Sequence, residues 1–259
     1  MEPLHCTTAG VPVRVQKQAI IGGMKRCARW WTLVLCFAGA ARAAPALLQD
    51  TLAQRLKACT VCHGDQGRAA PDGYQPRIAG KPAGYLYNQL LNFRDGRRHY
   101  GPMVGLVSPL SDAYLQEIAS HFAAIDLPYP APAAVNETPA LLQRGRQLAL
   151  EGDAAKQLPA CTTCHGAALT GVLPATPGLL GLPRDYLIGQ LGAWLTQQRQ
   201  AHAPDCMANI ARRLNGSDLG AVSAWLASQP VPVPANAVPP SASPPPLRCG
   251  SAGGPGAAR

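Results

Sequence analysis

The apolar positions of this chain follow the three- and four-residue spacing of one helix face in several separate stretches. Three kinds of helix are predicted, each present twice. They are an entry helix with Leu47, Leu48, Leu52 and Leu56 or with Leu141, Leu142, Gly145 and Leu148; a middle helix around Tyr85–Phe93 or Tyr186–Leu195; and a last helix with Leu115, Ile118 and Phe122 or with Leu219, Val222 and Leu226. No stretch alternates convincingly with the two-residue period of a strand, so an all-α fold is predicted.

Polar residues mark where the last helix of each half should begin. Ser111 or Asp112 precedes the first copy, and Ser217 or Asp218 precedes the second. Short Ser and Asp side chains accept hydrogen bonds from the free amides of a helix N-terminus, so we expect the two helices to start there. The stretch between the middle and last helices contains Gly and Pro, and it predicts an irregular loop.

The two halves form an internal repeat. Residues 80–90 match residues 181–191 at a constant offset of 101, with the same Gly, Pro, Tyr-Leu and Gln-Leu positions. We therefore predict one domain over residues 46–128, a second over 137–229, and a Pro-rich linker over 129–136 between them.

The stretch Cys-Thr-x-Cys-His occurs once in each half, at 59–63 and at 161–165. Two thiols about one helical turn apart can add to the two vinyl groups on one edge of a porphyrin, and the next histidine can then reach the iron. Cysteine pairs of this spacing also occur in zinc sites and redox dithiols, and two pairs could share one zinc ion. The adjacent histidine and the surrounding repeat favour covalent haem attachment.

Each half also holds one methionine about forty residues after its histidine. Met103 and Met207 correspond at an offset of 104, and they are the methionines that remain once a signal peptide is removed. Methionine is usually core filler, but one in register in each repeat favours a thioether ligand on the distal side of the iron. His99 and His202 lie nearby; they leave bis-histidine ligation as an alternative, or else lie at the surface or the haem edge.

Composition narrows the possible partners. The net charge is +9, but residues 1–43 hold six basic residues against one acidic, and the remainder holds 17 against 13. The sequence has no basic cluster interleaved with aromatic residues, the pattern that would predict nucleic-acid binding. Phe, Trp and Tyr together make up 5% of the chain, too few to fill two small cores unless each core encloses a macrocycle.

Residues 1–43 are predicted to be an N-terminal extension with a signal peptide. A positive stretch at 25–29 precedes an apolar run at 30–38 and a small-residue cleavage pattern at 41–43. The run is short for a transmembrane helix. We place the true start at Met24 and the protein in the periplasm, with membrane association only through a partner or an uncleaved signal.

Two cysteines, Cys206 and Cys249, lie outside both motifs and the signal segment. A disulfide between them, free thiols, and competition of Cys206 for the iron are all open at this stage. Residues 230–259 are rich in Pro, Gly and Ala, a composition that cannot bury enough surface to order itself, so they are predicted to form a disordered tail.

Over about residues 46–229 the chain resembles the class I c-type cytochromes, specifically the two-domain dihaem group called cytochrome c4. The shared pieces are the two Cys-Thr-x-Cys-His-Gly motifs, two Pro-x-[Ile/Leu]-x-Gly segments, two Tyr-Leu-x-x-Gln-Leu helices and two methionine elements. The resemblance implies an all-α fold of two tandem domains related by a pseudo-twofold axis, each wrapped around one covalent haem. It also implies a periplasmic electron carrier, often one that serves a haem–copper terminal oxidase.

The resemblance assigns a role to ten residues. The covalent haem links are Cys59, Cys62, Cys161 and Cys164; the axial iron ligands are His63 and Met103, and His165 and Met207; the carbonyl groups that accept from the proximal histidines belong to Pro76 and Pro177. Cys206, directly before Met207, and the Pro-rich tail depart from the family pattern.

Three functional hypotheses follow. The first is a dihaem carrier of single electrons between respiratory partners, and the second is a cytochrome subunit of a larger dehydrogenase, docked by the tail. The third, a haem enzyme such as a peroxidase, is disfavoured because a distal methionine closes the iron. A basic group, Arg94, Arg97 and Arg98, precedes Met103. It forms either a solvated surface or a site for a haem propionate or an acidic partner.

Overall fold

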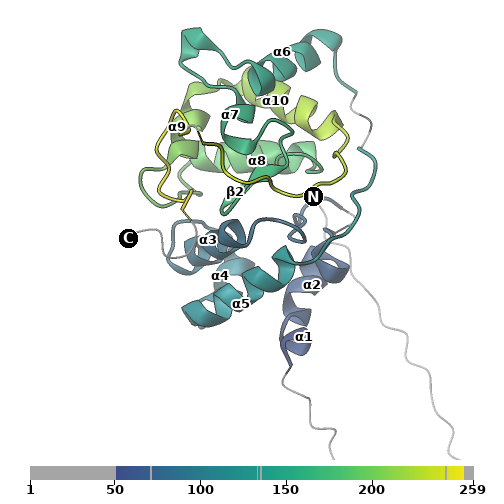
Figure 1. Ribbon diagram of the computed structural model, residues 1–259, viewed down its shortest axis with the longest axis vertical. Helices are drawn as coiled ribbons and strands as arrows, with labels where there is room; N and C mark the ends of the chain where they lie inside the picture. Colours follow the sequence, from purple (N-terminus) through teal and green to yellow (C-terminus); the bar gives the residue numbers. More distant parts are fainter. Residues whose placement is uncertain (1–50, 71, 133, 135, 243, 254–259) are drawn as a thin grey trace, which may run out of the picture. The chain divides into compact units, whose positions relative to one another are not determined.

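A computed structural model of the chain describes residues 51–253 apart from 71, 133, 135 and 243 (Figure 1). The predicted signal peptide, the start at Met24, and the leucines at 47 and 48 lie outside these residues. The described residues all belong to one compact unit, Gln49–Arg259. Among them, no helix has both the length and the apolarity needed to cross a bilayer.

The first half contains five α-helices and a 3-10 turn (Figure 1). These are α1 (Leu52–Arg55), α2 (Lys57–His63), the turn η1 (Asp65–Gly67), α3 (Ala83–Arg94), α4 (Gly101–Val107) and α5 (Asp112–Ala123). The predicted entry, middle and last helices correspond to α1 with α2, to α3 and to α5.

The second half repeats this order with a small hairpin added. Its elements are α6 (Pro139–Leu150), the turn η2 (Ala154–Lys156), α7 (Cys161–His165), β1 (Gly171–Val172), β2 (Thr176–Pro177), α8 (Arg184–Leu195), α9 (Cys206–Arg213) and α10 (Gly216–Ser228). β1 and β2 are antiparallel, with Gly171 opposite Pro177. Because each strand has two residues, the predicted all-α class is confirmed.

The apolar stripes of the helices meet in two separate clusters. In the first half α3 packs against α5, and in the second α10 packs against both α6 and α8. Burial of these stripes removes apolar area from water and stabilises each helix far more than its own propensity does. One cluster is built on Leu86, Leu91, Leu115, Ile118 and Phe122, and the other on Leu148, Leu180, Leu187, Val222 and Leu226. The domain boundaries at 128 and 137 stay a prediction.

The contact between α6 and α10 depends on a glycine. A Cβ atom at Gly145 would lie 2.7 Å from Trp225 Cβ and 2.7 Å from the carbonyl carbon of Ala221, and closer still to the oxygen of that carbonyl. Carbon atoms in contact are ordinarily about 3.5–4.0 Å apart. Gly145 therefore allows the two helices to approach backbone to backbone.

The predicted start of the last helix is right in the first half and late in the second. Ser111 caps α5 by accepting a hydrogen bond from the amide of Tyr114. In the second half the cap is Asn215, whose side-chain oxygen accepts from the amide of Asp218 at 2.8 Å. The helix α10 thus begins at Gly216, ahead of both predicted residues.

Asp218 does not cap the helix because its carboxylate is bound elsewhere. Its side chain is 5% exposed and accepts from Arg144 Nε at 2.8 Å and from the ammonium group of Lys156. Arg144 also donates to Asp153 at 2.7 Å. The acidic residue that resembled a helix start in the sequence is the centre of an ion-pair network between α6, η2 and α10.

Both methionines lie on short helices, whereas the sequence predicts an irregular loop. Met103 is the third residue of α4 and Met207 the second residue of α9. Pro102 stands in the first turn of α4, where no amide hydrogen is needed. Asp205 caps α9 by accepting from the amide of Ala208 at 3.0 Å. Gly101 and Pro102 thus begin a helix instead of preventing one, and Asp205 begins the corresponding helix in the second half.

The prediction of a disordered tail is wrong for residues 230–242 and 244–253. The amide of Val238 donates to Gly171 at 3.0 Å, and its carbonyl accepts from the amide of Leu173 at 2.8 Å. This segment is drawn in yellow in Figure 1. It adds one bridge to the β1 edge of the small hairpin.

Further along, Cys249 forms a disulfide with Cys206, which settles the state of the two unassigned cysteines. Composition measures the surface that a segment can bury by itself. It misses a segment that docks on an existing domain and is cross-linked to it, and this is the physical reason for the error.

Candidate haem-binding site

The first candidate ligand, His63, is the last residue of α2. Its Nδ1 lies 2.8 Å from the carbonyl oxygen of Pro76. Since a carbonyl can only accept, Nδ1 must carry the hydrogen, and the lone pair of the neutral ring is then on Nε2. The hydrogen bond fixes both the tautomer and the orientation of the ring.

The second half repeats this arrangement. His165 is the last residue of α7 and is 7% exposed, and its Nδ1 lies 2.7 Å from the carbonyl oxygen of Pro177. The hydrogen bonds expected for Pro76 and Pro177 are therefore both present. Each half thus presents an imidazole with an unprotonated Nε2, half-buried at His63 and buried at His165.

Burial keeps both imidazoles neutral. It lowers the pKa of His63, against the opposing effect of the Pro76 hydrogen bond, and the charge of Arg98 lowers it further. Burial likewise lowers the pKa of His165, again opposed by its hydrogen bond to Pro177. Neutral imidazole is the form that binds a metal.

None of the four motif cysteines takes part in a disulfide. Burial raises the pKa of Cys161 to about 11 and raises the pKa of Cys164, and burial with the nearby Cys62 raises the pKa of Cys59. The described residues contain no group of three or more His, Cys, Asp or Glu side chains placed to hold a metal ion. The alternative of one zinc ion shared by the two cysteine pairs therefore has no geometric support in that part of the chain.

One cavity of about 1960 Å³ contains both motifs. An ordinary small-molecule pocket measures about 300–1,000 Å³, so this volume is about twice the upper end of that range. Lining residues include His63 and Met103 from the first half and His165 and Met207 from the second. The volume and the chemistry of the lining residues fit two large macrocycles, each of which would have two cysteines at one edge and an imidazole toward its centre.

A pair of arginines lies where the two halves meet. Arg98 and Arg199 face each other across a short antiparallel bridge. The guanidinium of Arg98 donates to Gln89 at 2.9 Å and to Gln190 at 2.5 Å. That of Arg199 donates to the same two side chains, at 3.1 Å and 2.8 Å.

Neither of these arginines has a carboxylate partner among the described residues, although Arg199 is only 6% exposed. A third cation, Lys81, is 5% exposed and lines the same cavity. Buried charges are ordinarily paired, since isolation in a medium of low dielectric constant is costly. The cavity is thus suited to a group that brings its own carboxylates, as the propionates of haem do.

The structure divides the predicted basic group. Arg94 pairs with Asp112 at 2.6 Å and with Asp95, and Arg97 also pairs with Asp95. Arg98 alone of the three donates to the glutamine pair at the junction. Sequence reasoning did not single out Arg199, although it stands 101 residues after Arg98, the offset of the repeat.

The two alternative histidines also line the cavity. His99 is exposed, and its backbone amide donates to the carbonyl of Gln198 at 2.8 Å. His202 is half-buried and lines the cavity, with its Nε2 3.4 Å from the guanidinium of Arg97.

Comparison with known proteins agrees with this geometry. The chain matches no protein-family model. A thiosulfate dehydrogenase electron acceptor of Thiomonas intermedia strain K12 is 37% identical over 173 residues, which are 67% of this chain and 79% of that protein. Cytochrome c4 of Pseudomonas aeruginosa is 32% identical over 181 residues, which are 68% of this chain and 87% of that protein. The chain belongs to the cytochrome c4 family. The crystal structure of reduced cytochrome c4 from Pseudomonas stutzeri has a TM-score of 0.59 at 28% identity and covers 68% of this chain and 95% of its own.

As a member of the cytochrome c4 family, the chain is a c-type cytochrome with two haem c groups and an electron carrier. It has the fold of tandem class I domains that the sequence predicts. The disulfide from Cys206 to Cys249 joins the two features, Cys206 and the Pro-rich tail, in which the chain departs from the family pattern quoted above.

Proposed function

We propose that the chain carries single electrons between redox partners in the periplasm, after export by the signal peptide predicted over residues 1–43. Each half binds one haem through two thioether bonds, at Cys59 and Cys62 or at Cys161 and Cys164. The observation that carries the proposal is the repeated histidine–proline hydrogen bond beside a cavity that both methionines line.

In this proposal His63 with Met103, and His165 with Met207, are the axial iron ligands. Bound haem supplies one-electron redox chemistry, and a methionine thioether favours the reduced state. The carbonyl groups of the two prolines keep each imidazole turned with Nε2 toward the cavity. With both axial positions occupied by side chains, no position is left for a substrate, which favours a carrier over a peroxidase.

The ligand assignment is tested on the holoprotein matured in a periplasm. A pyridine haemochrome assay should give two covalently bound haems for each chain. Met103→Ala and Met207→Ala should each remove half of the methionine–ferric-iron absorption band, while His99→Ala and His202→Ala should leave it intact. A full band in either methionine variant would overturn the assignment, and a single haem would overturn the two-site proposal.

For the electron donor, we propose a dehydrogenase that oxidises thiosulfate. The support is the relative named as a thiosulfate dehydrogenase electron acceptor, which is 37% identical over 79% of its own length. The electrons would then pass to a respiratory acceptor such as a haem–copper terminal oxidase.

The donor is tested by mixing the oxidised holoprotein with purified thiosulfate dehydrogenase and following haem reduction after thiosulfate is added. Haem reduction should require both the dehydrogenase and thiosulfate. A quinol-oxidising complex is tested in parallel as the competing electron donor. Faster reduction by the quinol-oxidising complex, with none by the dehydrogenase, would reject this donor and leave the carrier function standing.

The second candidate function is a permanent cytochrome subunit of such a dehydrogenase. The same relative favours it, but docking through the tail loses support, because residues of the tail up to Ser251 already bind this chain. Co-purification of the two proteins at a fixed ratio through size-exclusion chromatography would distinguish a subunit from a mobile carrier.

A further inference from the structure

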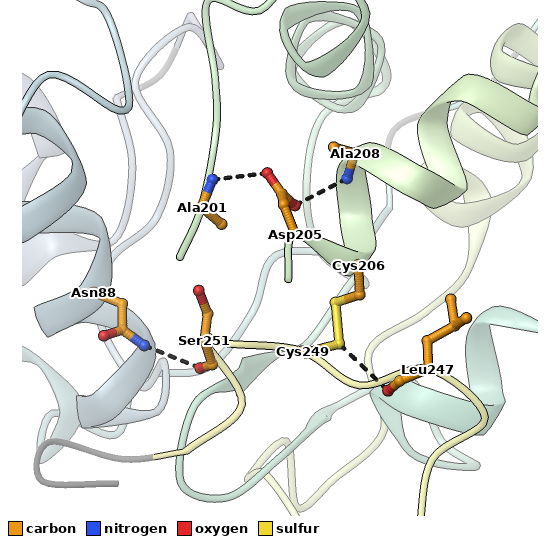
Figure 2. Close-up of a disulfide and its surroundings, with 8 residues drawn as sticks. All are labelled: Asn88, Ala201, Asp205, Cys206, Ala208, Leu247, Cys249 and Ser251. Carbon is orange, nitrogen blue, oxygen red and sulfur yellow. Dashed lines mark hydrogen bonds between the residues drawn. A yellow bond between two sulfur atoms is a disulfide. The ribbon is translucent and has the colours of Figure 1, made fainter. Parts of the chain in front are cut away.

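The disulfide between Cys206 and Cys249 lies beside the proposed distal ligand of the second haem (Figure 2). Cys206 is the first residue of α9, and Met207 is the second. Cys249 belongs to the C-terminal segment, 43 residues further along the chain. The cross-link therefore attaches the end of the chain directly to the start of the methionine helix.

The C-terminal segment is anchored on both sides of this cross-link. Before it, Val238 is hydrogen-bonded to the β1 edge of the hairpin. After it, the amide of Gly250 donates to the carbonyl of Pro204 at 3.0 Å, and Ser251 O accepts from Nδ2 of Asn88 on α3 at 3.0 Å (Figure 2). Cys249 is thus a fixed point and not the end of a loose arm.

The start of α9 has one other attachment of its own. The carboxylate of Asp205 accepts from the amides of Ala208 and Ala201, at 3.0 Å and 2.7 Å (Figure 2). A helix of eight residues is too short to be stable by itself, so its packing against α8 and the contacts at its first turn decide where its side chains lie.

The methionine helix of the first half, α4, is constrained in a different way. The residue before Met103 is Pro102, whose ring fixes the backbone dihedral φ at the helical value. The residue before Met207 is Cys206, a residue with free φ, and at this position the chain carries the disulfide instead. Each methionine helix is thus constrained at the residue directly before its methionine, once by a ring and once by a cross-link.

We infer that the Cys206–Cys249 disulfide is a positioning device that holds the thioether of Met207 on the iron of the second haem. The inference depends on the proposed function, because it takes Met207 as a ligand. Without the cross-link, only noncovalent contacts such as the hydrogen bond of Gly250 to Pro204 join the C-terminal segment to the start of α9, and Met207 leaves the iron more readily. Both cysteines are positioning residues, since their sulfur atoms are bonded to each other and not to the haem.

The experiment uses the full-length holoprotein in a Met103→Ala background, so that the methionine–ferric-iron band reports on Met207 alone. The variant C206S/C249S removes the cross-link without leaving a thiol that could bind iron. We expect the equilibrium constant for loss of the band, followed against temperature or pH, to rise about tenfold or more, the scale of stabilisation that a disulfide ordinarily gives.

Two comparisons decide the outcome. In a Met207→Ala background the same double replacement should leave the Met103 band unchanged, because α4 is not attached to the segment. The variant C206P/C249S should restore most of the Met207 band, because proline fixes the residue directly before Met207 as Pro102 does before Met103. Asp205 has the extended backbone that a residue before proline prefers.

The two possible failures are distinguishable. If the band of Met207→Ala is as strong as that of the wild type, Met207 is not a ligand and the assignment in the proposed function is wrong. If that assignment holds but C206S/C249S loses the band at the same temperature and pH as its parent, the positioning role is wrong. A haem count of two shows that each variant has folded, and in the Met207→Ala background an intact Met103 band shows it as well. A C206S/C249S protein that fails this check is replaced by C206A/C249A in the same comparison.

Discussion

The glycine at the crossing of α6 and α10 gives a direct test of the packing of the second half. The perturbation is Gly145→Ala, a single added methyl group in the middle of α6. By helix propensity alone, alanine should stabilise the helix by up to about 1 kcal/mol relative to glycine. The position of the new Cβ predicts the opposite result.

The magnitude follows from the distances at that site. An alanine Cβ would be 2.7 Å from Trp225 Cβ and 2.7 Å from the carbonyl carbon of Ala221. Restoring ordinary contact requires α6 and α10 to separate by roughly 1 Å. Overpacking of this kind costs about 1–3 kcal/mol, occasionally more, and a rigid backbone carbonyl puts this site at the upper end. After the gain in propensity, we expect a net loss of about 2 kcal/mol.

The assay is thermal unfolding of the haem-loaded protein, followed by far-ultraviolet circular dichroism. A loss of that size lowers Tm by roughly 4–8 °C for a chain of this length. The matched control is Gly220→Ala, which makes the same change on α10 where no atom lies within 4 Å. It should raise Tm by about 2–4 °C. A Gly145→Ala protein as stable as the wild type would refute the close approach of the two helices, and equal losses in both variants would show that the effect is not local.

Two further predictions concern charged groups. Burial raises the pKa of Asp218, but the hydrogen bonds and charges of Arg144 and Lys156 outweigh burial and hold that pKa below its usual value. The carboxylate therefore stabilises the fold above about pH 4 and ceases to do so as the pH falls through the lowered folded-state pKa. Asp218→Asn should cost about 1.5–3 kcal/mol in urea unfolding at pH 7, and the difference from wild type should shrink in acid. Replacement of Arg98 or Arg199 by Gln removes a cation from the haem cavity, so spectroelectrochemistry should show at least one reduction potential lowered by about 59 mV, a tenfold change for one electron.

Each charge prediction has a matched control. Glu151→Gln removes an ion pair with Arg146 whose two side chains are 63% and 57% exposed, so it should change stability by less than about 1 kcal/mol. A loss of stability in Glu151→Gln as large as that in Asp218→Asn would contradict the role of burial.

Arg94→Gln removes an arginine already paired with Asp112 and should leave both reduction potentials unchanged. Unchanged potentials in both junction variants would show that Arg98 and Arg199 do not act on the haems.

The sequence predicts well those features that depend on local periodicity. Leucine spacing places the middle and last helices, and the offset of 101 gives the pairing of the two halves. The resemblance to the cytochrome c4 family, carried by the motif and its downstream proline, also implies the hydrogen bond of His63 to Pro76. These signals are readable because each feature is set by residues close together in the chain.

Features decided by distant partners are not predictable in this way. The start of α10 moves to Asn215 because Asp218 is bound to a side chain 74 residues away. The tail is ordered because Cys249 finds a cysteine 43 residues before it. The arginine pair is made by segments 101 residues apart, and only the repeat offset hints at Arg199.

The sulfur chemistry of this chain has a consequence for its synthesis. The six cysteines in the described residues have different fates: four belong to the two haem motifs and must stay reduced until haem is attached, and two are oxidised to a disulfide. A cell that makes the protein must protect neighbouring thiols three residues apart from oxidation while it oxidises a pair 43 residues apart. We expect the yield of correctly assembled molecules to depend on the order of these two events, with haem attachment competing against premature oxidation of the motif thiols.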